Sequence, residues 1–409
     1  MRVNGKENNK NFFENVKNIV ILSFGSFGLN FMLLVYILTT SRLLIERSAS
    51  VTLSSVFLFS ELIIFAFTYP FFTYLYDITR SAIGRRTPYL IIFGILSSFN
   101  LTLIQKLSYI SLFPLLMVIA LFNFWLFLYT LAFFGMVKDK IVYHFRNIMI
   151  LHIKLWGIVG SITAYLYMLN SDKVQLGIET PVGGFLFLIS ALTVAFFIVE
   201  DKKYKVPLSR SEKPSYNYNI SDTFRFYNLE VKDIKKAIIM SLIYIYEFFI
   251  LNFLKDFSFR VSSINLLVFF LGVIFAYFIS LFSDNFRKIV GEKKVQNLAI
   301  IILSIAYLVF NYANIKIILG LQFFVGFLWG VILLSQLGYI VPGKSERFII
   351  YSVVIEDDSL KPDTKKLKFF FLSFILIIVL SFILDIVGVQ NASLVYSIIL
   401  FSTLILEKR

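Results

Sequence analysis

The sequence predicts an all-α polytopic membrane protein with twelve transmembrane helices in two six-helix bundles. Of its 409 residues, 58% are hydrophobic and only 16% are charged, which is far more apolar than the core of a soluble domain requires. The apolar residues are gathered into twelve runs, and one polar stretch at 200–236 divides these runs into six and six. The surplus of apolar side chains must therefore face lipid.

The twelve apolar runs are each long enough, or nearly so, for a membrane span of about 20 residues. They lie at 17–39, 51–76, 88–104, 109–137, 147–169, 181–199, 237–254, 261–283, 297–312, 316–341, 368–386 and 389–406. Two longer stretches, 88–137 and 297–341, exceed one span, and we divide them at Lys106 and Lys316. The polar N-terminus lacks the short apolar region of a cleavable signal peptide, so we expect the first helix to remain.

The basic residues indicate how the chain is oriented. With the N-terminus placed inside, 31 of the 39 Lys and Arg residues fall on the inner side and 7 on the outer side, while Lys154 lies within a span. This asymmetry follows the positive-inside rule, so both termini are expected in the cytoplasm and the protein in the plasma membrane. The net charge of +14 is then explained by topology and anionic lipid, without a nucleic-acid partner.

The chain is predicted to consist of an N-terminal bundle at 1–199, a cytoplasmic loop at 200–236 and a C-terminal bundle at 237–409. A short pattern repeats between the two halves at an offset of 207 residues, in each case after the second helix. Both copies read D-x-x-R-x-x-x-G followed by basic residues. The paired positions are Asp77 with Asp284, Arg80 with Arg287 and Gly84 with Gly291.

These repeated residues, together with Arg85 and Arg86, are predicted to form a cytoplasmic gate. A carboxylate at a helix end can pair with arginines or with an exposed helix N-terminus, and glycine permits a tight turn with positive φ. Such a cluster can hold bundles together in one state and release them in another. The positive-inside rule explains the charges alone, but it does not explain matching Asp, Arg and Gly in both halves.

The stretch "YDITRSAIGRRTPYL" at 76–90 resembles the major facilitator superfamily, and within it the glycoside-pentoside-hexuronide:cation symporters. The matching residues are Asp77, Thr79, Arg80, Ser81, Gly84, Arg85, Pro88 and Tyr89. More loosely, Asp139, Arg146 and Lys154 resemble that family's basic region after helix 4. The resemblance implies a monomeric secondary transporter for a sugar or glycoside. Phe65 and Tyr69 occupy places where cation-coupled members carry acidic residues, so a proton is favoured over sodium.

Ionisable residues inside the apolar runs are candidates for ion coupling, because a charge in the hydrocarbon costs about 2.5–3.5 kcal/mol on insertion scales. Glu247 lies 11 residues beyond Lys236, near the predicted midplane, and is the first candidate for a proton carrier. Glu61 and Asp385 are further candidates, although both can also reach interfacial water. Lys154 is open to three interpretations: a partner of Glu247, a substrate contact, or a side chain that extends to the interface.

A sugar site requires aromatic faces beside polar groups. The candidates for substrate binding, besides Lys154, are Asn123, Trp125, Tyr129, Tyr244, Tyr246 and Trp329. Any one of them can equally serve helix packing or an interfacial aromatic belt. Two other cargo or function classes stay open: an exporter or lipid carrier of the same fold, and a non-transporting membrane subunit.

Enzymatic, cofactor and metal functions find no support in the motifs. The chain contains no cysteine, which excludes disulfides and thiolate metal sites. "GYIVPGKS" at 338–345 fits the phosphate-loop expression, but an apolar span precedes it and no α/β domain fits before the next helix, so we expect no nucleotide. The predicted partners are a small-molecule substrate, a coupling ion and the lipid bilayer.

Overall fold

The computed structural model describes residues 4–48, 50–107, 111–140, 146–169, 178–201, 231–242, 245, 259–336 and 364–405. Within these residues every regular element is a helix. The helices are α1 (Asn4–Ser48), α2 (Val51–Leu58), α3 (Ser60–Ile78), α4 (Thr87–Leu107), α5 (Leu112–Lys140), α6 (Arg146–Leu169), α7 (Glu179–Phe197), α9 (Val231–Leu242), α10 (Phe259–Phe282), α11 (Asp284–Gly291), α12 (Lys293–Tyr312), α13 (Ile315–Gln336), α14 (Thr364–Val387) and α15 (Ala392–Ile405), with a 3-10 turn at Val389–Asn391.

Each of the twelve predicted apolar runs overlaps at least one of these helices, and the predicted fold class is confirmed. Both predicted breaks are confirmed as well, because α4 ends one residue after Lys106 and α13 begins one residue before Lys316. One difference concerns the run at 51–76, which is divided at Phe59 into α2 and α3. There the Ser60 hydroxyl donates a hydrogen bond to the Phe57 carbonyl, a local bond that competes with the regular helical pattern.

Six helices of the described part are long and apolar enough to cross a membrane: Phe13–Ser48 within α1, then α4, α5, α7, α12 and Ile315–Ile332 within α13. Three shorter apolar stretches lie at Ile264–Ala276, Phe371–Val387 and Ala392–Leu404. Each helix satisfies its own backbone hydrogen bonds, as a hydrocarbon environment requires. The chain is therefore a multi-pass membrane protein.

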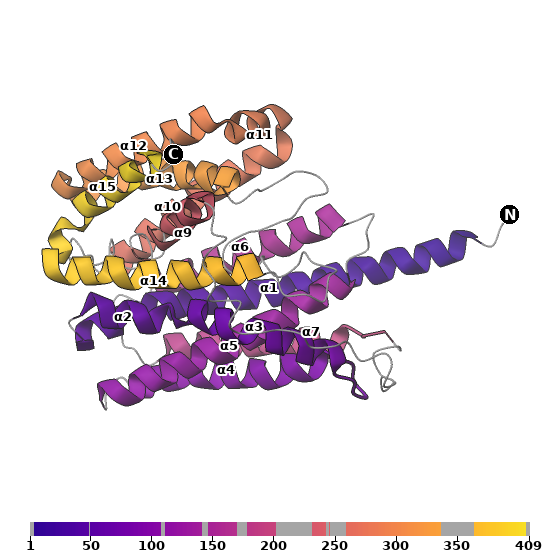
Figure 1. Cartoon of the computed structure of the whole chain (residues 1–409). Helices are drawn as coiled ribbons and strands as arrows, with labels where there is room; N and C mark the ends of the chain where they lie inside the picture. Colours follow the sequence, from indigo (N-terminus) through magenta and orange to yellow (C-terminus); the bar gives the residue numbers. More distant parts are fainter. Residues whose placement is uncertain are drawn as a thin grey trace. The chain divides into compact units, whose positions relative to one another are not determined.

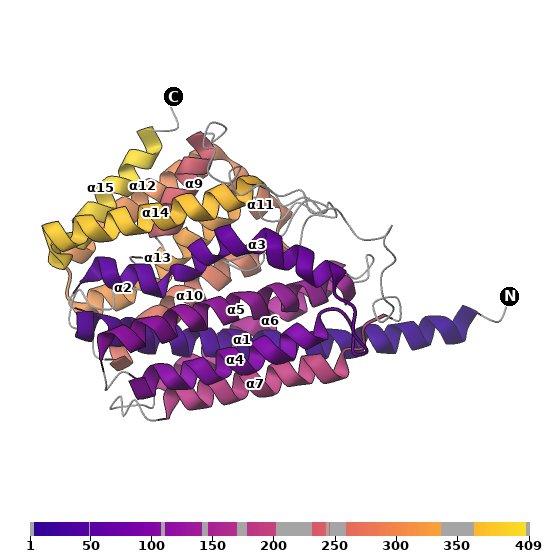
Figure 2. The ribbon, with the colours of Figure 1, turned by 60° about the horizontal axis from the view of Figure 1, so that its bottom comes forward.

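The chain forms two compact units. Unit 1 comprises Met1–Thr40, Thr68–Met168 and Lys173–Tyr218. Within it α4 packs against both α5 and α7, and Figure 2 shows these three helices running side by side. Aromatic side chains fill the contact, with the rings of Tyr129 and Phe187 in an edge-to-face arrangement at a centroid distance of 4.7 Å. This packing fixes the start of α4 against the ends of α5 and α7.

Unit 2 comprises Ser41–Phe67, Leu169–Asp172 and Asn219–Arg409. Within it α10 packs on α13, α12 packs on α15, and α14 lies beside α2 and α9 (Figure 1). The α10–α13 contact is very close, since a Cβ added at Gly326 would lie 2.0 Å from the carbonyl oxygen of Phe269. Small residues at such positions let helix backbones approach, which is how transmembrane helices associate without a hydrophobic driving force.

Candidate functional site

The connection between α3 and α4 is an irregular turn that contains the centre of the predicted gate. Gly84 has φ +125°, a conformation that side chains with a Cβ rarely adopt. A Cβ at this position would also lie 2.5 Å from the carboxyl carbon of Glu200. Two independent constraints, backbone conformation and available space, thus require glycine here, as the sequence predicts for Gly84.

Glu200 follows α7 and caps the N-terminus of α4. Its carboxylate accepts hydrogen bonds from the backbone N–H groups of Arg85 (2.9 Å), Arg86 (2.8 Å) and Thr87 (2.8 Å), and from the Thr87 hydroxyl (2.9 Å). The first N–H groups of a helix have no partner within the helix, and a negative charge there also interacts favourably with the helix dipole. Glu200 is 3% exposed, so these bonds are shielded from water.

Asp139, in the last turn of α5, binds the side chains of both arginines. Its carboxylate accepts from Nη2 of Arg85 at 2.6 and 2.8 Å and from Nε of Arg86 at 2.8 Å. Such forked contacts are among the strongest hydrogen bonds in proteins. Gly135, one turn earlier, provides the space, because a Cβ there would lie 2.0 Å from Nη1 of Arg86.

We name the four residues Arg85, Arg86, Asp139 and Glu200 the arginine clamp. It joins the α3–α4 turn, the end of α5 and the segment after α7, and all of these lie within unit 1. Its two guanidinium groups are balanced by two carboxylates. Removal of one member of a buried pair typically destabilises a protein by about 3–5 kcal/mol, because the other charge is left without its partner. The described bonds of the clamp therefore fix the shape of one unit.

A layer of hydroxyl groups lies next to the clamp. The hydroxyl groups of Thr79 and Tyr89 are 2.6 Å apart, and the Tyr76 hydroxyl donates to the Leu128 carbonyl at 2.8 Å. The rings of Tyr76 and Tyr89 pack at a centroid distance of 4.4 Å. Arg80 donates to the carbonyl of Thr79 at 2.8 Å. These bonds connect the end of α3 with the start of α4 and with the middle of α5.

The second copy of the repeated pattern has a different backbone conformation. Ser283 caps α11, its hydroxyl accepting from the Phe286 N–H at 3.1 Å, and the stretch from Asp284 to Gly291 is helical. Positive φ is found at Gly84 and Gly388 among the described glycines, so Gly291 does not share the turn of Gly84. The side-chain placements of Asp77, Asp284 and Arg287 lie outside the described residues, and their gating role stays a prediction.

Most of the predicted midplane residues lie outside the described part of the chain. This holds for Glu247, Tyr244 and Tyr246, and for the side chain of Lys154, whose backbone belongs to α6. Their predicted roles in coupling and binding are not tested. Glu61 lies in the first turn of α3 and is partly buried.

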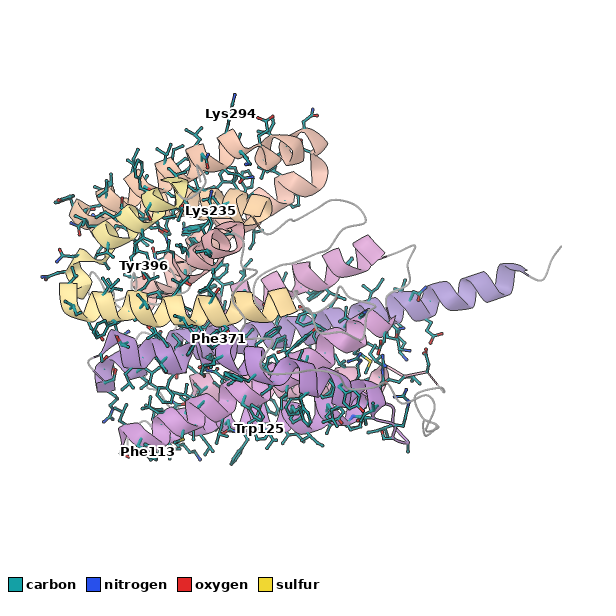
Figure 3. The ribbon with its side chains drawn as sticks, viewed as in Figure 1. Phe113, Trp125, Lys235, Lys294, Phe371 and Tyr396 are labelled. Carbon is teal, nitrogen blue, oxygen red and sulfur yellow. The ribbon has the colours of Figure 1, made fainter. Side chains whose placement is uncertain are left out.

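Four predicted substrate residues lie in helix contacts within their own units. Tyr129 and Asn123 are buried in α5, and Trp125 of the same helix, which is labelled in Figure 3, stacks on Phe93 at a centroid distance of 5.8 Å. Trp329 is 1% exposed, and its indole N–H donates to the Tyr307 hydroxyl at 2.5 Å. In this structure Tyr129, Trp125 and Trp329 contact aromatic residues of neighbouring helices, and Asn123 is buried.

Asp385 is placed near the end of α14, where it accepts three hydrogen bonds from residues at the start of α2. The donors are the Ser50 hydroxyl at 2.9 Å and the backbone N–H groups of Val51 at 2.8 Å and Thr52 at 3.0 Å. Both oxygens of the carboxylate are thus engaged. The sequence alone indicated no such partner for Asp385.

Sequence reasoning did not single out Glu200 and Gly135 of the clamp region, and it named Asp139 only within a loose family resemblance, without a partner. A usable signal was present, since Asp139 and Glu200 are acidic residues at the ends of apolar runs on the same predicted side as Arg85 and Arg86. Opposite charges at neighbouring helix ends on one side of a membrane are expected to pair. Among the described residues, no group of three His, Cys, Asp or Glu side chains is arranged to hold a metal ion.

No protein-family model matches the chain, and no curated protein matches it in sequence. Solved structures do match, over almost the whole chain. A point mutant of the nucleoside transporter NupG has a TM-score of 0.66 at 14% identity, covering 95% of this chain and 99% of its own. The D-xylose-proton symporter has a TM-score of 0.60 at 13% identity, covering 96% and 97%.

Two further structures have a similar degree of likeness. The peptide transporter POT in complex with sulfate has a TM-score of 0.62 at 13% identity, covering 95% of this chain and 92% of its own. The human organic anion transporter MFSD10 has a TM-score of 0.59 at 13% identity, covering 96% and 99%. At such identities the likeness concerns the fold. The chain therefore has the same all-α polytopic fold as these solved transporters.

Proposed function

We propose that the protein is a secondary active transporter that moves a small polar solute by alternating access. The observation that carries this proposal is the likeness, over 95% or more of the chain, to solved transporters with different cargoes. Transporters of this kind place the substrate site near the bilayer midplane between repeated halves and move one half against the other. The predicted six-plus-six arrangement supports the same mechanism.

The proposed cargo is a sugar or glycoside, and the proposed coupling ion is a proton. The motif at 76–90 supports the sugar, and the solved D-xylose-proton symporter gives one example of a sugar and a proton handled by this fold. Phe65 and Tyr69, which stand in place of acidic residues, weigh against sodium. Glu247 is the proposed proton carrier, with Glu61 and Asp385 as further candidates.

The arginine clamp has a supporting role in this proposal. A transporter that rocks between two states needs bundles that move as rigid bodies. Three segments of unit 1 are joined by charge-assisted bonds at a predicted cytoplasmic end, where water would otherwise weaken the packing. We propose that the clamp keeps this end rigid while Asp77 and Asp284 make and release contacts that change with the state.

Uptake into proteoliposomes tests the proposal. The purified protein is reconstituted and supplied with labelled sugars, glycosides, nucleosides and dipeptides, each under an imposed proton gradient, an imposed sodium gradient, or neither. We expect accumulation of a sugar or glycoside that depends on the proton gradient. Accumulation of a nucleoside or dipeptide instead would show that the proposed cargo is wrong. If no compound accumulates under any gradient, the proposal of a transporter is contradicted.

Glu247→Gln separates coupling from binding in the same assay. The amide keeps the size of the side chain but cannot carry a proton. We expect this variant to exchange substrate across the membrane without concentrating it. Glu46→Gln serves as the control, since it removes an exposed carboxylate that lies outside the predicted apolar runs. A Glu247→Gln protein that still concentrates substrate with the proton gradient would remove the assignment of Glu247 alone.

A further inference from the structure

Three polar features of the described residues stand out beyond the arginine clamp: the buried amide of Asn265, the buried carboxylate of Glu179, and the contact between the start of α2 and Asp385, which is also a candidate for proton coupling. Only the contact of Asp385 has complete donor and acceptor geometry. It also joins residues separated by 333 to 335 positions in the sequence. The contact of Asp385 is therefore the most completely defined of the three features.

The hydrogen bonds between Asp385 and the start of α2 can break and form again. Ser50 is the N-cap of α2, with φ −122° and ψ 125°, and its own hydroxyl accepts from the Leu53 N–H at 3.2 Å. Asp385 adds a negative charge to this N-terminus and takes the N–H groups of Val51 and Thr52, which have no partner within the helix. Asp385 is exposed, so water can replace these donors when the contact opens.

Neighbouring contacts also connect segments that were predicted to belong to different bundles. Residues 41–67 belong to the predicted N-terminal bundle, yet their contacts place them in unit 2 with α14. Along α14, Phe371, which is labelled in Figure 3, lies edge-to-face with Phe67 of α3 at a centroid distance of 6.3 Å. One end of α14 thus meets α2 through hydrogen bonds, and the other end meets α3 through an aromatic pair.

We propose that Ser50, Val51, Thr52 and Asp385 form an outer latch, which holds the outer ends of the predicted bundles together in the state described here and must open for the alternate state. This inference rests on the proposed function and on the predicted topology, which puts residues 40–50 and 387–388 on the outer side. The outer latch stabilises one conformation by supplying an anion to a helix N-terminus in that conformation only. Its loss is expected to shift the population of states without altering substrate contacts.

Because the chain contains no native cysteine, a thiol-reactive label attaches only at the introduced cysteines. Spin labels are attached to a Lys106→Cys/Gln390→Cys protein, whose labelled positions are exposed on α4 and on the 3-10 turn after α14, and their distance distribution is measured in lipid nanodiscs. We expect Asp385→Asn in this background to increase the longer-distance population by about two- to fivefold, the factor that corresponds to a charge at a helix N-terminus. No substrate is needed, so the result is independent of whether a cargo has been found.

The matched control is Glu46→Gln in the same background. Glu46 is an exposed acid near the same end of α1, where it pairs with Arg42 at 3.1 Å, and it makes no described contact with α2. We expect this variant to leave the distance distribution unchanged. An unchanged distribution in Asp385→Asn, or an equal shift in Glu46→Gln, would overturn the latch and leave Asp385 as a simple helix cap.

A crosslink provides a second test if Asp385→Asn does not fold. In Ser50→Cys/Asp385→Cys the two side chains occupy positions that are hydrogen-bonded in the native chain, so an oxidant should join them. We expect substrate exchange to stop on oxidation and to return on reduction, while Ser50→Cys alone, which keeps Asp385, is insensitive to both reagents. Undiminished transport by the oxidised double variant would contradict the proposal that the latch has to open.

Discussion

Glu200 illustrates how a single residue can define a helix end. Its carboxylate takes the place of three missing intrahelical acceptors at the start of α4, and the adjoining Asp201 pairs with Lys140 at 2.8 Å in a more exposed position. These neighbouring acids have the same charge but different surroundings. Buried hydrogen bonds to a charged group contribute about 1.5–3 kcal/mol, whereas exposed ion pairs contribute about 0–1 kcal/mol.

We predict that Glu200→Gln lowers the free energy of unfolding by about 1.5–3 kcal/mol, while Asp201→Asn changes it by less than about 1 kcal/mol. The amide retains one acceptor oxygen but brings an N–H₂ group against the N–H donors of α4. Thermal unfolding followed by tryptophan fluorescence in detergent measures both variants. Equal destabilisation by the two would show that the cap contributes no more than an exposed charge.

Asn265 of α10 is a polar residue in a fully buried position. It is 0% exposed, and neither atom of its amide has a hydrogen-bond partner among the described residues. An unsatisfied buried amide costs about 1–3 kcal/mol, and leucine has a similar volume without polar atoms. We predict that Asn265→Leu raises the melting temperature of the purified protein. A lower melting temperature would indicate that the amide has a partner, such as bound water.

At the scale of elements, the clamp depends on small residues as much as on charges. We predict that Gly84→Ala destabilises the protein by at least about 1–3 kcal/mol, because alanine at φ +125° is strained and its Cβ would meet Glu200. The control is Gly320→Ala in α13, where a Cβ would meet nothing within 4 Å. In a helix this exchange is expected to stabilise by up to about 1 kcal/mol. Loss of stability in the control would contradict the reasoning.

Gly135 and Asp139 act on the same guanidinium group from one face of α5. We predict that Gly135→Ala and Asp139→Asn are non-additive: the double variant should lose less stability than the sum of the single losses, since either change alone displaces Arg86. A double-mutant cycle on melting temperature measures the coupling. Additive losses would mean that Arg86 keeps its place when one of these neighbours is changed.

The sequence was informative about elements and less so about their local contacts. Long apolar runs and the positive-inside bias are averaged over many residues, which is why both uncertain breaks, near Lys106 and Lys316, are confirmed. The two copies of the repeated D-x-x-R-x-x-x-G pattern differ in local structure, because Gly84 has a positive φ whereas in the second copy the Ser283 cap starts a helix. The clamp partners Asp139 and Glu200 are distant in sequence from Arg85, and no local pattern encodes their approach.

For the whole molecule, the proposed mechanism depends on the predicted orientation of the chain in the membrane. Single cysteines at Lys106, Lys316 and Lys294, all exposed, can be labelled because the chain has none of its own. We expect a membrane-impermeant maleimide to label Lys106→Cys and Lys316→Cys in intact cells, and Lys294→Cys only after permeabilisation. The opposite pattern would reverse the predicted orientation and place the arginine clamp on the outer side.

The cap formed by Glu200 also bears on how the protein is made. The Arg85 N–H and the Glu200 carboxylate that accepts its hydrogen bond are separated by 115 residues in the sequence, so the start of α4 lacks its acceptor while all of α5, α6 and α7 are being synthesised. At about 5–20 residues per second, this interval lasts roughly 6 to 23 seconds. Unit 1 can therefore reach its final structure only when the ribosome has passed its last helix, and translational pausing after residue 200 would allow this half to mature before the second half enters the membrane.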